Sequence, residues 1–154
     1  MINSLRNLPE YKFFIVGEGK SRKPLEKLVR KLKLETRCHF AGFRQDAWQY
    51  LSFYDIYALP SRSEGFSLAL LEAAIYSVPT VASNLAVNME AFTSEEVSFF
   101  NLKNPESISH AIINATGNKK MGDKMNHRFV SDYSPDLQYK RYLDIYQNRN
   151  SCAT

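Results

Sequence analysis

A glycine that follows a carboxylate marks the segment of the sequence that is best suited to form a ligand-binding site. Glu64 stands directly before Gly65, and Glu72 follows eight residues after Glu64. Glycine lets a ligand approach the backbone closely, and a helix that begins just after it presents free N–H groups and a positive dipole to an anion. The N–H groups placed for this role are those of Phe66, Ser67 and Leu68. The segment therefore predicts a binding site for a phosphate or diphosphate.

The same residues also allow a purely structural interpretation. Ser67 can serve only as the N-cap of the helix, and Gly65 only as the turn residue. Glu72 favours a function, because its Leu and Ala neighbours predict a buried helix face, where an unpaired carboxylate is costly. A carboxylate that accepts hydrogen bonds from ribose hydroxyls, as in dinucleotide-binding folds, would explain it. The alternative is that Glu72 points to water or pairs with a Lys or Arg.

Short apolar runs and helical patterns alternate around this segment. Strands are predicted at residues 12–16, 38–41, 56–59, 80–82 and 97–102. Helices are predicted at residues 22–33, 47–53, 68–76, 107–116, 119–129 and 135–147. Asn104 is the expected N-cap of the fourth of these helices, with Pro105 at its first position. This alternation predicts an open, Rossmann-like, mostly parallel α/β sheet with helices on both faces, in which ligands bind beyond the carboxyl ends of the strands.

Length and composition set the broad class of protein. A chain of 154 residues that is 44% hydrophobic predicts a single globular domain spanning residues 1–154. The longest uncharged stretch, residues 73–89, is interrupted by Pro79 and several polar residues, so no transmembrane helix is expected. The N-terminus lacks the apolar core of a signal peptide, and Cys38 and Cys152 are too few for a disulfide framework. We therefore expect a cytoplasmic protein.

Positive charge is concentrated in one helical segment of a chain whose net charge is +4. The cations of this segment are Lys20, Arg22, Lys23, Lys27, Arg30, Lys31, Lys33 and Arg37. They predict an amphipathic helix whose basic face is either simply solvated or attracted to an anionic membrane surface or nucleic acid. No nucleic-acid motif accompanies them, so a nucleic-acid partner is not expected. His39, His110 and His127 lack the spacing of metal ligands, and no metal site is expected.

Several segments together resemble a known enzyme family. The run from Glu64 to Leu68, with Glu72 after it, resembles the E-x7-E motif of the retaining glycosyltransferases of family 4, the group 1 transferases of GT-B fold. The segments that match other motifs of that family, in order, are Phe14 to Gly19, Phe40 to Phe43, Leu59 to Ser61, Val78 to Ala82 and Glu90. The resemblance covers about residues 5–147.

The resemblance implies that the chain is the Rossmann-like C-terminal domain that binds a nucleoside-diphosphate sugar, the donor substrate. Glu72 would bind the ribose, and the backbone from Gly65 through Phe66 and Ser67 to Leu68, in one loop with Ser61, would bind the phosphates. Glu64 would contact the donor sugar as the catalytic carboxylate. Gly17 would let the sugar diphosphate approach the first strand, and the base would lie near the loop after Gly42. Transfer would retain the anomeric configuration and need neither a metal nor another cofactor.

Departures from the family pattern imply an incomplete enzyme. No basic "GR…KG" segment precedes Phe13, Ser77 stands where the family usually has glycine, and Ala86-Val87 stands where a glycine pair is common. The first strand and the acceptor-binding domain are therefore expected to be missing, so that transfer to a glycan or lipid-linked acceptor needs an N-terminal domain or partner chain.

Other partners and functions remain open at this point. A stripe on the last helix suggests a homodimer; it consists of Tyr139, Tyr142, Leu143 and Tyr146. Peripheral contact with the inner face of a membrane is a further possibility. The alternatives to a donor-binding domain are a degenerate, non-catalytic module that contacts a partner or membrane, and a nucleotide-sugar epimerase or hydrolase of the same fold class.

Overall fold

The computed structural model describes residues 1–151, so Cys152 lies outside the described residues. Its strands are β1 (Phe13–Val16), β2 (Cys38–Gly42), β3 (Tyr57–Leu59), β4 (Thr80–Ser83) and β5 (Ser98–Phe100). Its α-helices are α1 (Arg22–Lys31), α2 (Leu68–Ile75), α3 (Ala86–Ala91), α4 (Pro105–Gly117), α5 (Lys120–Arg128) and α6 (Pro135–Ser151). Two 3-10 helices, η1 (Ile2–Asn7) and η2 (Ala47–Phe53), and one π-helical segment, η3 (Phe129–Tyr133), complete the elements.

All the strand pairs are parallel, and helices flank them, as the alternation in the sequence predicts. Hydrogen bonds divide the strands into two sheets with the orders β1-β2 and β3-β4-β5. In sequence order, the chain passes from β1 to β2 in one sheet and from β3 through β4 to β5 in the other. Ligands of parallel α/β sheets bind beyond the carboxyl ends of the strands, so the loops that follow β1 and β3 are where a ligand is expected.

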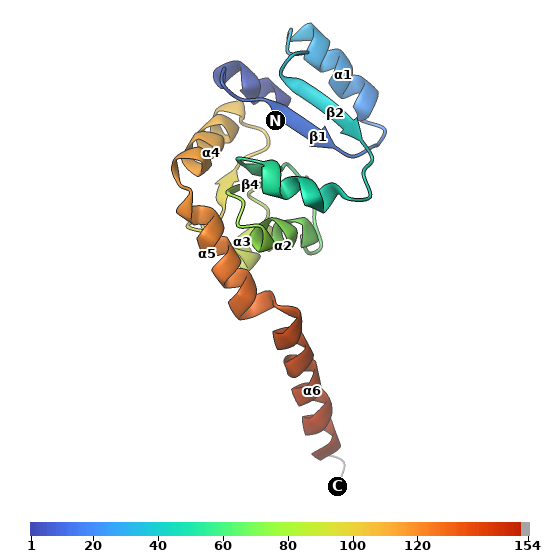
Figure 1. Ribbon diagram of the computed structural model, residues 1–154, viewed down its shortest axis with the longest axis vertical. Helices are drawn as coiled ribbons and strands as arrows, with labels where there is room; N and C mark the ends of the chain where they lie inside the picture. The colour runs from blue at the N-terminus through green and yellow to red at the C-terminus, as the bar shows by residue number, and fades with distance from the viewer. Residues whose placement is uncertain (152–154) are drawn as a thin grey trace.

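The two sheets share a hydrophobic core although they share no hydrogen-bonded strand. Phe13 of β1 and Ala58 of β3 pack against one buried cluster, to which β4, β5, α4, α5 and Leu8 after η1 contribute. Leu8, Phe100 and Ile108 are almost fully buried in it. A second cluster fills the opposite side of β3, where α2 and α5 cover Leu59 and Tyr57 of that strand. The protein is thus layered, with helices on both faces of its strands (Figure 1).

Local sequence signals explain most of the element boundaries. Asn104 caps α4 as predicted, since its side-chain oxygen accepts hydrogen bonds from the N–H groups of Glu106 and Ser107, and Pro105 occupies the first turn. Residues 47–53 form a 3-10 helix instead of the expected α-helix, and α3 lies where the sequence predicted only a loop. A helix as short as α3 offers too little periodicity to be recognised.

Ser77, which replaces a glycine of the family pattern, follows the carboxyl end of α2. Its φ of +52° is in the left-handed region, which favours glycine because a Cβ atom is strained there. The backbone geometry of this position therefore explains a preference for glycine. It lies at the opposite end of α2 from the phosphate-site residues predicted above.

The last helix projects away from the rest of the protein (Figure 1). The side chains of Tyr139, Tyr142, Ile145 and Tyr146 on α6 are all exposed by more than half. The aromatic stripe predicted from the sequence therefore lies open, and a homodimer through it stays a prediction. Among residues 1–151, no helix is both long enough and apolar enough to cross a bilayer.

Candidate functional site

The loop from Pro60 to Ser67 joins the carboxyl end of β3 to α2 and is anchored to the neighbouring strand. The Ser83 hydroxyl, at the end of β4, donates to the backbone oxygen of Ser61 over 2.7 Å. The amide of Asn88 on α3 donates in turn to the backbone oxygen of Ser83 over 2.9 Å. Ser83 and Asn88 are both fully buried. Two buried polar side chains therefore fix the start of the loop.

Within this loop, Ser61 also orients the first candidate carboxylate. The Ser61 hydroxyl donates to Oε1 of Glu64 over 2.5 Å, and Glu64 is half-buried. This hydrogen bond uses one carboxylate oxygen of Glu64 and leaves the other oxygen for another donor. The structure thus brings together two of the residues predicted from the sequence, Ser61 and Glu64.

The amino end of α2 has unused hydrogen-bonding groups. Ser67 occupies the N-cap position and is only 7% exposed, yet its side chain makes no capping bond and its buried Oγ has no partner. Within the described residues, the N–H groups of Gly65, Phe66 and Ser67 also have no acceptor. The expectation of a free N–H at Leu68 is wrong in this structure, because that group donates to the backbone oxygen of Phe66 over 3.2 Å.

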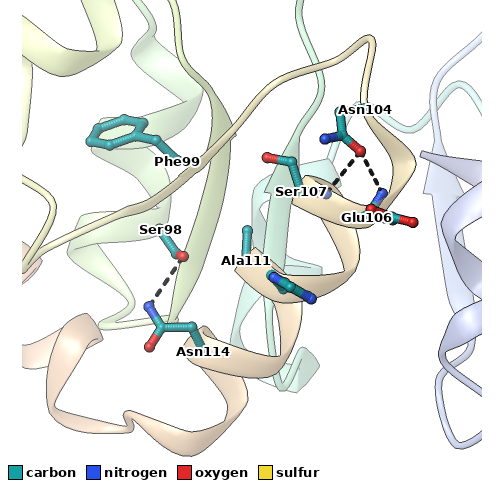
Figure 2. Close-up of a pocket in the computed structure, with 8 residues that line it drawn as sticks. Ser98, Phe99, Asn104, Glu106, Ser107, Ala111 and Asn114 are labelled. Atoms are coloured by element: carbon teal, nitrogen blue, oxygen red, sulfur yellow. Dashed lines mark hydrogen bonds between the residues drawn. The ribbon is translucent and has the colours of Figure 1, made fainter.

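At the amino end of α4, by contrast, a side chain already binds the first N–H groups of the helix. A pocket of about 450 Å³ lies beside the amino end of α4, and there Asn104 already binds the first N–H groups of the helix (Figure 2). Asn114 and Ser98 in the same pocket are hydrogen-bonded to each other. Several polar groups of that pocket thus bond one another, whereas those at α2 are left for an incoming acceptor. A buried polar group without a partner is costly, so the end of α2 favours an anionic ligand.

Glu72 lies on the second turn of α2. The expectation that it faces a buried helix surface is wrong, because its side chain is exposed, whereas its neighbours Ala73 and Ala74 are fully buried. Burial, followed by the nearby carboxylates of Glu72 and Glu64, raises the pKa of Tyr57 to about 12. Both predicted carboxylates therefore lie near the same tyrosine on β3, on the side of the strand that α2 covers.

Gly17, the remaining predicted site residue, directly follows β1 of the other sheet. Its φ of +129° requires glycine, its N–H donates to the backbone oxygen of Gly42 over 2.8 Å, and no atom lies within 4 Å of where a Cβ would be. The space beside Gly17 is open, which suits the close approach of a ligand. No hydrogen bond of the described residues joins Gly17 to the loop 60–67.

Some residues that shape the site were not identified from the sequence. Phe66 rests against Tyr133 of η3, with ring centroids 5.9 Å apart, and the Tyr133 hydroxyl donates to the backbone oxygen of Ala91. Ser83 and Asn88 were missed because nothing local distinguishes a serine or asparagine that binds a distant backbone oxygen.

Among residues 1–151, no group of three His, Cys, Asp or Glu side chains could hold a metal ion.

Comparison with known sequences agrees with these motifs. The family profile "Glycosyl transferases group 1" matches residues 1–131. The O-antigen biosynthesis glycosyltransferase WclY of Escherichia coli is 28% identical over 149 residues, which are 96% of this chain and 42% of WclY. An E. coli UDP-Gal:alpha-D-GlcNAc-diphosphoundecaprenol alpha-1,3-galactosyltransferase is 27% identical over 144 residues, 90% of this chain and 37% of that protein. The chain thus spans about two fifths of the length of these relatives.

Comparison with solved structures supports the fold. Anabaena Alr3699/HepE, crystallised in complex with UDP, superposes with a TM-score of 0.87 over 96% of this chain and 44% of that one, at 19% identity. WaaG, a glycosyltransferase involved in lipopolysaccharide biosynthesis, superposes with a TM-score of 0.71 over 93% of this chain and 39% of WaaG, at 20% identity. At these identities the similarity shows the fold alone, which is that of GT-B glycosyltransferases. With the profile match over residues 1–131, the chain belongs to the group 1 glycosyltransferase family.

Proposed function

We propose that this chain is the donor-binding domain of a retaining glycosyltransferase of family 4 and that it binds a uridine-diphosphate sugar. The observation that carries the proposal is the amino end of α2, where the buried Ser67 hydroxyl and the N–H groups of Gly65 and Phe66 have no partner. A diphosphate would supply acceptors to all of them at the positive end of the helix. UDP is favoured because HepE was crystallised with UDP.

Each remaining site residue has a role in this proposal. Glu72, exposed on α2, accepts hydrogen bonds from the ribose hydroxyls. Glu64, held by Ser61, contacts the donor sugar, and Gly17 leaves open space for the sugar diphosphate. In the reaction, the bond between the anomeric carbon and the diphosphate oxygen breaks, and the nucleoside diphosphate leaves with the bonding electrons. The acceptor hydroxyl forms the new bond on the same face of the sugar, and its proton passes to the departing diphosphate oxygen.

In this proposal, residues 1–154 do not contain the binding site for the acceptor. Relatives that act in O-antigen biosynthesis or on a diphosphoundecaprenol-linked sugar favour a glycan or lipid-linked acceptor. Because the chain spans about two fifths of their length, we propose that a second domain or partner chain supplies the acceptor site. Transfer then requires both parts, whereas donor binding requires only this one. Neither a metal nor another cofactor has a role in the proposed reaction.

Replacement of the ribose-binding carboxylate tests the proposal. We expect Glu72→Ala to weaken the affinity for UDP at least tenfold, because a hydrogen bond to a charged group contributes about 1.5–3 kcal/mol. Affinity is measured by isothermal titration calorimetry, with GDP and ADP as competitors. Since Glu72 is exposed and has no ion pair with a described residue, the folded state should be unaffected.

The matched control is Glu35→Ala, which removes an exposed carboxylate before β2. It should leave the affinity for UDP unchanged. Equal affinities of the Glu72→Ala variant and the unsubstituted protein would refute the ribose assignment. If UDP does not bind to the unsubstituted protein at millimolar concentration, the degenerate, non-catalytic module is favoured instead.

A further inference from the structure

The strongest concentration of charge on the protein lies on α1, away from the loop 60–67. The segment from residue 18 to residue 33 has seven cations and two carboxylates, a net charge of +5, against +4 for the whole chain. The remainder of the protein is therefore nearly neutral. This segment alone accounts for the basic character of the chain.

One arginine forms ion pairs with both carboxylates of this segment. Arg22 forms ion pairs with Glu18 and Glu26, and these bonds raise the pKa of Arg22. Arg37, which the sequence placed with the basic residues, binds the backbone oxygens of Leu5, Leu8 and Tyr11 and holds η1 in place. Neither arginine is therefore available to an external anion.

The other cations of α1 lie on one face of the helix. Lys23, Lys27 and Lys31 are spaced four residues apart, and Arg30 lies beside them, so together they cover roughly 100° of the helix surface over about 12 Å. All four are exposed, whereas Val29 on the opposite face is buried against β1 and β2. None of the four forms an ion pair with any carboxylate among the described residues.

Two of the cations on α5, in contrast, are paired with carboxylates. There Lys124 pairs with Glu95 over 2.5 Å, and Arg128 pairs with Asp132 over 3.0 Å. A basic face that lacks such partners has an attractive potential for an extended anionic surface. We propose that the basic face of α1, formed by Lys23, Lys27, Arg30 and Lys31, binds the anionic surface of a lipid bilayer.

The composition of this face favours lipid headgroups over nucleic acid. A flat row of lysine and arginine on a convex helix fits the plane of a bilayer, and clusters of four or more such residues bind anionic lipids. Nucleic-acid modules add aromatic side chains that stack on bases or amides that read base edges. The exposed positions between Lys23 and Lys31 hold only Pro24 and cations. This inference does not depend on donor binding, because it uses no residue of the loop 60–67.

Vesicle sedimentation with the full chain tests the proposal. The probes are phosphatidylcholine vesicles with and without one part in three of phosphatidylglycerol, at low and high salt. We expect binding to the anionic vesicles only, and its loss at high salt, where charges are screened within a few ångströms. Each cation near such a surface strengthens partitioning about fivefold, so Lys27→Gln/Lys31→Gln should weaken it about 25-fold.

The matched control is Lys119→Gln/Lys120→Gln, which removes two exposed lysines at the start of α5. It changes the net charge equally and should weaken binding less than threefold. Equal losses in the two double variants would overturn the assignment to α1, and so would equal binding to neutral vesicles. Tighter binding to a duplex DNA of 20 base pairs than to the anionic vesicles, lost in Lys27→Gln/Lys31→Gln, would assign the face to nucleic acid instead. Circular dichroism of each variant verifies that it is folded.

Discussion

Ser67→Asp should abolish most nucleotide binding while making the protein more stable. An aspartate at this position can cap α2, which Ser67 does not, and its negative charge suits the positive end of the helix. The free energy of unfolding should therefore rise by up to about 1 kcal/mol. The same carboxylate would occupy the N–H groups proposed for the diphosphate and repel its charge. Two like charges about 4 Å apart near a protein surface cost about 4 kcal/mol, so the affinity for UDP should fall about 100-fold or more.

The opposite signs of the two effects make this variant informative. Most substitutions that damage a site also destabilise the protein, and loss of binding then has two explanations. Urea unfolding gives the stability and calorimetry gives the affinity. Ser67→Asn is the matched control, since it has the same shape as aspartate without the charge and should lose tenfold at most. An unchanged affinity in Ser67→Asp would show that the diphosphate does not lie at the amino end of α2.

Gly122→Ala is expected to be the most destabilising of the variants considered. Gly122 is buried on α5, and a Cβ atom there would lie 1.9 Å from the backbone oxygen of Ser77 and 3.2 Å from the backbone nitrogen of Pro79. Backbone atoms at the entry to β4 cannot move aside as a flexible side chain could. We therefore expect the free energy of unfolding to fall by about 3 kcal/mol, although alanine is the better helix former.

Gly117→Ala is the control for helix propensity. Gly117 is the last residue of α4, and no atom lies within 4 Å of the position of its Cβ. This variant should be neutral or up to about 1 kcal/mol more stable. Urea unfolding of both variants gives the comparison. Similar unfolding midpoints for the two would contradict the close packing of α5 on the turn between α2 and β4.

The sequence predicts most elements of this fold because their signals are local. The Asn104 cap with Pro105, the glycine turn at Gly17 and the apolar strands all depend on residues close together in the chain. The need for glycine at residue 122 depends on contact with the turn at Ser77, 45 residues away. The separation of β1 from β3 likewise depends on how strands pair across the chain. Neither feature leaves a periodicity in the sequence.

The sequence predicts where the helix end of the candidate site lies, but it predicts the surroundings of that end less well, and the binding role of the site stays a prediction. A carboxylate before a glycine, with a helix after it, indicates the amino end of α2 without knowledge of the fold. The Leu and Ala neighbours of Glu72 predicted that its side chain is buried. A mainly apolar helix can still expose one of its faces, however, and Glu72 lies on that face. The buried supports of the loop, Ser83 and Asn88, act through backbone oxygens that any residue has. Such contacts follow from the fold alone.

Backbone amide chemical shifts recorded during a titration with UDP show which residues of the protein the nucleotide contacts. We expect the largest shifts at Gly65, Phe66 and Ser67, where N–H groups without an acceptor would gain hydrogen bonds, and a smaller shift at Glu72. These shifts should saturate together with one dissociation constant. Shifts confined to another surface, such as the pocket between Ser98 and His110, would contradict the proposed site at the amino end of α2.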